Sequence, residues 1–105
     1  TRRNLRLLMA VHGDAGKQVW VTEFGAPTGG PTAVDEAEQA RMLTSALALL
    51  ADEPWSGPVF LYAYRDAGTD PADREDWFGV VTHSGRPKVA ATRLADLART
   101  APEAR

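Results

Sequence analysis

Hydrophobic residues recur at helical spacing in three stretches of the chain. The first predicts a helix from Asn4 to His12, which Gly13 would end. The second predicts a helix from about Asp35 to Ala51, and the third a helix that begins near Pro87, a good first helical position. The residues on the three stripes are Leu5, Leu8, Met9 and His12; Ala40, Leu43, Leu47 and Leu50; and Ala90, Leu94, Leu97 and Ala98.

Two other stretches are rich in β-branched and aromatic residues, which favour strands. They are Val-Trp-Val-Thr-Glu-Phe from Val19 to Phe24 and Val-Phe-Leu-Tyr-Ala-Tyr from Val59 to Tyr64. Both are apolar on both faces, as expected for strands covered on two sides. Because side chains alternate along a strand, one face of the first is expected to carry Val19, Val21 and Glu23, and the other Trp20, Thr22 and Phe24.

Glycine, proline and polar residues separate these elements. The segment from Gly25 to Pro31 contains three Gly and two Pro and predicts a loop. Pro54 and the pair Gly57-Pro58 are expected to break the chain before the second strand, and a long polar loop is expected from Arg65 to Asp76. At the start of the second helix, Thr32 and Asp35 are expected to form a capping pair.

The element order, helix, strand, helix, strand, long loop and helix, predicts an α/β fold with a parallel sheet. We expect the two strands to be parallel neighbours linked by the helix from Asp35 to Ala51. Two strands alone leave two unpaired edges, and a complete β/α barrel needs about 250 residues. The rest of a sheet therefore lies outside this chain, or the chain self-associates. The isolated chain is expected to be marginally stable or oligomeric.

Composition narrows the possible functions. The chain has 105 residues, 44% of them hydrophobic, and a formal net charge of -2 without a basic stripe, which argues against nucleic-acid binding. The apolar run that contains Leu47 to Ala51 is too short to cross a membrane. The absence of cysteine excludes disulfides and thiolate chemistry. The sequence begins with Thr1 rather than Met, so we expect a processed or partial chain.

Glu23 has the most informative position in the sequence. It lies at the end of a strand expected to be buried, where an ionised carboxylate is costly unless it is paired or functional. A Gly-rich loop follows it, and α/β folds build their sites at this carboxyl edge of the sheet. The alternative is a surface glutamate where the strand emerges into solvent. Position alone leaves both open.

Three aromatic residues are candidates for a sugar site. Tyr62 and Tyr64 are alternate residues near the end of the second strand, and either could hydrogen-bond Glu23, line the site or pack against a helix. Tyr64, nearer the strand end, is the preferred candidate. Trp77 could stack on a sugar ring, because the indole face is flat and apolar, or could anchor its loop to the fold.

The remaining polar residues do not predict a metal or cofactor site. The acidic loop lacks the spacing of an EF-hand, so we expect a solvated loop with local ion pairs; its charged residues are Arg65, Asp66, Asp70, Asp73, Arg74, Glu75 and Asp76. His12 and His83 lack ligand spacing. No nucleophile elbow and no phosphate-binding loop occurs.

Several motifs, taken in order, resemble one enzyme family. Val19-Trp-Val-Thr-Glu-Phe-Gly25 resembles the seventh strand of retaining (β/α)8-barrel glycoside hydrolases of clan A, which include families 5 and 39. Gly57-Pro-Val-Phe-Leu-Tyr-Ala-Tyr-Arg-Asp66 resembles their eighth strand. Asp76-Trp-Phe-Gly-Val80 and Ser84-Gly-Arg-Pro-Lys-Val-Ala90 resemble the segment leading into their closing helix.

The resemblance implies that residues 1–105 form the C-terminal portion of a TIM barrel, incomplete in this chain, with strands seven and eight and flanking helices. It implies Glu23 as nucleophile, Tyr64 and Trp77 as sugar contacts, no cofactor and no metal. The partners would be a carbohydrate substrate, with glucan, mannan, xylan and small glycosides all open, and the missing N-terminal part of the barrel, with no nucleic acid and no membrane. A secreted or extracellular enzyme is expected, since polymeric substrates lie outside cells.

One departure from the family pattern concerns the second catalytic carboxyl group. The family's acid/base glutamate follows an asparagine at the fourth strand, whereas the only asparagine here, Asn4, precedes Leu5. Retaining hydrolysis needs two carboxyl groups, so this chain alone is expected to be inactive. Two alternatives remain: a carbohydrate-binding or pseudo-enzyme barrel, and an independent small α/β interaction domain.

Overall fold

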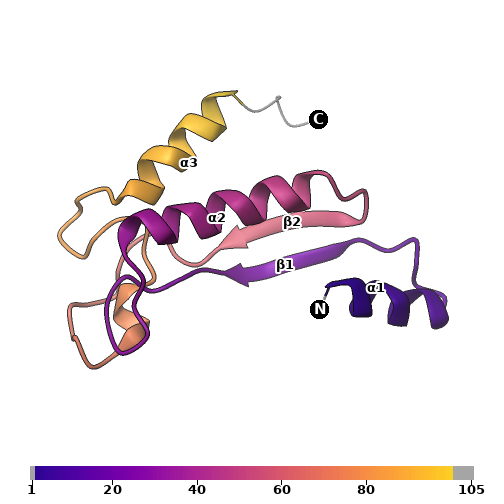
Figure 1. Cartoon of the computed structure of the whole chain (residues 1–105), viewed down its shortest axis with the longest axis horizontal. Helices are drawn as coiled ribbons and strands as arrows, with labels where there is room; N and C mark the ends of the chain where they lie inside the picture. Colours follow the sequence, from indigo (N-terminus) through magenta and orange to yellow (C-terminus); the bar gives the residue numbers. More distant parts are fainter. Residues whose placement is uncertain (1, 101–105) are drawn as a thin grey trace.

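The computed structural model describes residues 2–100 of the chain. Its elements, in order, are α1 (Arg2–Val11), β1 (Val19–Phe24), α2 (Glu36–Ala51), β2 (Ser56–Leu61), the 3-10 helix η1 (Arg74–Trp77) and α3 (Val89–Thr100). The two strands form a parallel two-stranded sheet, with α2 lying between that sheet and α3 (Figure 1). The predicted α/β class, the parallel pairing and the linking helix are therefore confirmed.

The second strand lies earlier in the chain than the sequence predicts. It spans Ser56–Leu61 instead of Val59 to Tyr64, and Gly57 and Pro58, which we expected to break the chain, are inside it. They lie at an irregularity in the pairing, where Val19 is partnered by Ser56 but Val21 by Val59. A proline is tolerated at such a bulge because the ladder is already interrupted there.

Tyr62 to Tyr64 leave the ladder because their backbone bonds to a different segment. The Tyr62 amide still donates to the Phe24 carbonyl at 2.8 Å. The Ala63 amide instead donates to the Phe78 carbonyl at 2.9 Å, and the Tyr64 carbonyl accepts from Val81 at 2.9 Å. The segment after η1 thus folds back onto the end of β2.

Helix α2 begins as the sequence predicts, but with one capping residue. The Asp35 side chain accepts a hydrogen bond from the Glu38 amide at 2.7 Å, which satisfies a donor that the first turn leaves unpaired. The expected capping pair with Thr32 is wrong, since Asp35 alone caps the helix and Thr32 is exposed. Of the predicted stripe, Ala40 and Leu43 are buried, whereas Leu47 and Leu50 are half-buried.

The hydrophobic core is small and lies between α2, α3 and the sheet. It consists of Ala40, Leu43 and Ala90, with Phe24, Leu61, Val80 and Leu94 packed against it. Helix α3 starts at Val89, two residues after Pro87. Only the first half of its predicted stripe is covered, and Leu97 is 44% exposed.

The predicted helix at the start of the chain is present as α1, but its apolar stripe is largely exposed in the described part of the chain. Leu5 and Leu8 are 42% and 57% exposed. The helix is attached instead by Arg6, whose guanidinium donates to the Ala15 carbonyl at 2.9 Å and lies 5.3 Å from the Trp55 ring. No other described element covers its apolar side, because α1 lies beyond the start of β1 (Figure 1).

The described chain is flat and has one bare sheet face. Its extents are 46 × 32 × 18 Å and its radius of gyration is 15.7 Å, against about 13 Å for a compact domain of this length. Trp20 and Phe60, whose rings lie 6.4 Å apart, are 58% and 50% exposed on the face away from α2. The strands are thus apolar on both faces but covered on only one.

No helix within residues 2–100 is long and apolar enough to span a bilayer.

Candidate active site

A β-bulge decides where the Glu23 side chain points. Val21 pairs with Val59 and Phe24 with Leu61, so three steps along β1 match two steps along β2. Val21 is half-buried and Phe24 packs against the core under α2, while Glu23 is exposed. The extra residue therefore turns Glu23 away from the helix-covered face. The prediction that Glu23 shares a face with Val21, opposite Phe24, is wrong, because simple alternation ignores the bulge.

The Glu23 carboxylate lies at the carboxyl edge of the sheet without a partner among residues 2–100. The end of β1 is joined to the end of β2 by the bond between Phe24 and Tyr62. The Tyr62 ring contacts Phe78 at a centroid distance of 5.4 Å. Tyr64, two residues further on, is 75% exposed. The expected hydrogen bond from Tyr64 to Glu23 is not formed within the described chain.

Trp77 is held firmly by the loops around it. Its indole Nε1 donates to the Asp70 carbonyl at 2.7 Å. A Cβ added at Gly29 would lie 2.2 Å from its Cδ2 atom, so the ring packs directly on that glycine. These contacts match the anchoring role that the sequence left open beside sugar stacking.

The acidic loop differs from the solvated loop that the sequence predicts. Asp70 and Asp73 accept backbone amides of their own turns, and Asp76 accepts the Asp70 amide at 3.1 Å. Asp66, by contrast, is only 4% exposed, and its carboxylate accepts both the Gly79 amide and the Lys88 ammonium at 2.8 Å. Local burial by the segment after η1 is the reason, and residue spacing does not reveal it.

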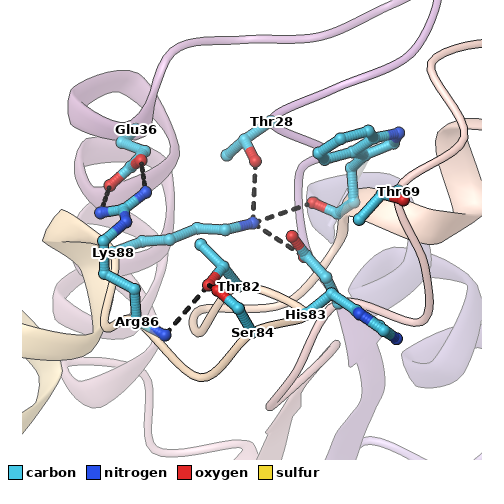
Figure 2. Close-up of a pocket in the computed structure, with 10 residues that line it drawn as sticks. Thr28, Glu36, Thr69, Thr82, His83, Ser84, Arg86 and Lys88 are labelled. Atoms are coloured by element: carbon cyan, nitrogen blue, oxygen red, sulfur yellow. Dashed lines mark hydrogen bonds and ion pairs between the residues drawn. The ribbon is translucent and has the colours of Figure 1, made fainter.

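Lys88 is a buried cation for which the sequence patterns predict no role in a site. It is 2% exposed, and its Nζ donates to Asp66 Oδ1 and Thr28 Oγ1, both at 2.8 Å, and to the Trp77 carbonyl at 3.4 Å. Figure 2 shows the hydrogen bond from its ammonium to Thr28 as a dashed line. It is one of only two lysines in the sequence and lies just before an apolar helical stripe. That combination was the available signal.

A cavity of about 410 Å³ lies beside this cluster, and Glu23 does not line it. Figure 2 shows Glu36 and Arg86 meeting on one side and the hydroxyl groups of Thr82 and Ser84 below them. Its other lining residues are Thr28, Asp66, Thr69, Trp77, His83 and Lys88. The cationic and anionic groups in its wall are paired with one another, so the cavity carries no strong net charge.

The Glu36–Arg86 pair joins the starts of α2 and α3. Arg86 donates to Glu36 Oε2 at 2.7 Å, and the Val89 amide donates to Glu36 Oε1 at 3.1 Å. The hydrogen bond from Arg86 lowers the pKa of Glu36 below its usual 4.5, against a smaller opposing effect of desolvation, and the Val89 amide lowers it further. Glu36 thus bonds one of the free amides at the start of α3.

Gln39 lies buried inside this framework. Its Nε2 donates to the carbonyls of Ala26 and Gly79 at 3.1 and 3.0 Å, which ties the loop after β1 to the segment after η1. Its Oε1 is buried without a partner among the described residues.

Within residues 2–100, no group of three His or carboxylate side chains is arranged to hold a metal ion.

No protein-family model and no curated protein sequence matches the chain. Solved structures do match it. The β-D-glucuronidase of Dictyoglomus thermophilum superposes with a TM-score of 0.74 at 21% identity over 95% of this chain. The β-glucuronidase of Bifidobacterium dentium, solved with coumarin-3-O-glucuronide, gives 0.72 at 23% over 95%. A family 39 glycoside hydrolase from Bacteroides cellulosilyticus WH2 gives 0.69 at 31% over 77%.

These similarities define the fold class: the chain folds as a segment of glycoside hydrolases does. It spans only 18%, 18% and 16% of those three proteins, less than a fifth of their length. The matches include a family 39 enzyme, one of the families that the sequence resembles, and also β-glucuronidases, which that resemblance did not name.

Proposed function

We propose that this chain is part of a retaining glycoside hydrolase and carries its catalytic nucleophile, Glu23. The observation that supports this most is the bulge in β1, which turns Glu23 onto the bare face at the carboxyl edge of a parallel sheet. In barrels of this kind the face opposite the helices is the interior, and catalytic residues lie at the carboxyl ends of the strands.

The same proposal explains what would cover the exposed edges and apolar surfaces of the chain. If β1 and β2 are strands seven and eight of a clan A (β/α)8 barrel of the family 5 or family 39 type, both free edges pair with strands from the remainder of the protein. Trp20 and Phe60 would then face the barrel interior. The apolar side of α1 would contact another barrel helix.

The chemistry needs two carboxyl groups. The ionised Glu23 attacks the anomeric carbon as the glycosidic bond breaks, and a second carboxyl group, supplied by the remainder of the barrel, protonates the departing oxygen. A water molecule, deprotonated by that second group, then hydrolyses the glycosyl-enzyme with net retention. The two groups lie about 5–5.5 Å apart in such enzymes.

A carbohydrate is the proposed substrate class, with Tyr64 as a contact because its side chain is exposed at the same edge as Glu23. Trp77 as a sugar contact stays a prediction. Its indole N–H is already bonded to the Asp70 carbonyl, so the contact would use the ring face. The uronosides cleaved by β-glucuronidases and the substrates of family 39 enzymes define the glycosides to try first. Secretion or an extracellular location is part of the proposal.

Covalent trapping tests the assignment. We would incubate the full-length protein with 2-deoxy-2-fluoro glycosides, including a glucuronide, which slow hydrolysis of the glycosyl-enzyme. Glu23 lies in the tryptic peptide 18–41, which also contains Asp35, Glu36 and Glu38, so fragmentation must locate the sugar. We expect it on Glu23. A sugar on another carboxylate refutes the assignment, and full-length protein inert on every glycoside tried supports the pseudo-enzyme alternative.

A further inference from the structure

Lys88 is the point where two loops of the candidate active site and η1 meet. Its ammonium binds Thr28 in the loop after β1, Asp66 in the loop after β2 and the carbonyl of Trp77 in η1 (Figure 2). Both Lys88 and Asp66 have side chains only 2% exposed. A buried ammonium and its buried partner are each costly to leave unpaired, so these bonds strongly constrain the loops.

The loops that Lys88 joins are also bonded to the ends of both strands. The Thr28 amide donates to the Trp77 carbonyl at 3.0 Å, and the Gly79 amide donates to Asp66 at 2.8 Å. Phe78, between Trp77 and Gly79, accepts the Ala63 amide at 2.9 Å. Ala63 follows Tyr62, whose amide bonds to the Phe24 carbonyl, one residue past Glu23. Lys88 is therefore connected to the end of β1 through hydrogen bonds and the short stretches of backbone between them.

We propose that Lys88 is a positioning residue, whose buried ammonium holds the loops after β1 and β2 in register and so fixes the sheet edge that carries Glu23. This inference rests on the proposed function where it concerns catalysis. Lys88 does not line the same surface as Glu23, and its three ammonium donors are matched by three protein acceptors, so the proposed role acts through the loops and not on the substrate.

A paired set of variants in the full-length protein separates positioning from folding. Lys88→Met leaves the Asp66 carboxylate buried without its cationic partner, so it lowers thermal stability. Asp66→Asn combined with Lys88→Met removes both charges, while the Asn oxygen still accepts the Gly79 amide. We expect this double variant to recover most of the lost stability. The bonds to Thr28 and to the Trp77 carbonyl remain missing in both.

We therefore expect turnover to stay low in the double variant even though its stability recovers. A displaced nucleophile should cost about a hundredfold in kcat with KM little changed, since a shift of about 1 Å has that effect. Glu36→Gln is the matched control, because it breaks an ion pair at the same cavity whose side-chain hydrogen bonds reach neither residues 25–30 nor residues 74–79. If kcat recovers along with stability, Lys88 is merely a folding residue and the proposal is wrong.

Amide hydrogen exchange gives a readout that does not depend on glycosidase activity. We expect faster exchange in residues 25–30 and 74–79 of the double variant, with the Thr28 amide as the key site, and no such change in Glu36→Gln. Unchanged protection overturns the positioning role whatever the enzyme does. The expected exchange in a protein that cleaves no glycoside would support loop positioning and contradict the proposed function.

Discussion

Gly25 lies directly against the carbonyl of Tyr62. A Cβ atom added at Gly25 would come within 1.9 Å of that carbonyl oxygen and 3.3 Å of the Phe78 ring. The backbones after β1 and after β2 therefore touch at the residue two positions past Glu23, and only glycine leaves room for this approach. The Gly in the Glu-Phe-Gly sequence has a steric reason that is separate from any catalytic role.

Gly25→Ala should destabilise the full-length protein and reduce its activity. The added methyl must push apart two backbone segments, which typically costs about 1–3 kcal/mol in a packed site. We expect this loss in denaturant unfolding, together with reduced turnover because Glu23 lies beside the displaced segment. Gly16→Ala is the control, since its Cβ would meet nothing within 4 Å. Equal stability of the two variants would contradict the steric explanation.

Glu36→Gln should lower stability at neutral pH but not in strong acid. The folded-state pKa of Glu36 is below its usual 4.5, so its ionised form stabilises the fold above that pH, and the contribution disappears as the pH falls through the folded-state pKa. The pair is largely exposed to solvent, so the contribution should be small.

Thermal unfolding of wild type and Glu36→Gln across pH 2.5 to 7 measures this effect. We expect a constant gap in Tm above about pH 5 that closes in acid. Glu75→Gln, at an exposed glutamate whose carboxylate has no partner among the described residues, should show no gap. A gap for Glu36→Gln that persists at pH 2.5 would point to packing instead of charge.

The isolated chain of residues 1–105 should self-associate or unfold without cooperativity. Within residues 2–100 its sheet has two free edges, and Trp20 and Phe60 lie exposed on one face. Sedimentation at several concentrations should show this, and Phe60→Glu should weaken association. A cooperatively folding monomer would instead favour an independent small α/β domain.

The sequence predicts local elements well because each has its own signal. The apolar stripe of α2 and the β-branched run of β1 suffice to give their bounds, and strand order with an intervening helix suffices for parallel pairing. The stripe of α1 is a real helical signal as well. Its burial, however, depends on neighbours that residues 2–100 do not include.

The errors arise where backbone pairing between distant segments decides the structure. The bulge before Phe24 and the early end of β2 both depend on which carbonyl meets which amide, and side-chain patterns do not report that. Asp66 and Lys88 are 22 positions apart and meet only because η1 and its flanks fold back on the strand ends. The prediction of a solvated loop treats every charged residue in the run as exposed, which is wrong for Asp66.

Two substitutions at Glu23 should differ in a way that only a nucleophile explains. Glu23→Gln keeps the shape of the side chain but removes the attacking charge, so turnover in the full-length enzyme should fall by several orders of magnitude. Glu23→Asp keeps the charge but withdraws it by one methylene, or roughly 1 Å, so about a hundredfold loss is expected. Because the side chain is exposed and unpartnered within the described chain, neither change should lower stability much.

Glu75→Gln again serves as control and should keep normal turnover, since it removes another exposed carboxylate, in η1. The order of activities, wild type and control above Glu23→Asp above Glu23→Gln, separates the possible roles. If Glu23 only binds sugar hydroxyls, Glu23→Gln should raise KM more than it lowers kcat, because a Gln amide still makes hydrogen bonds. If Glu23→Gln retains wild-type kcat, the nucleophile lies elsewhere in the protein, and the bulge in β1 is a feature of the fold alone.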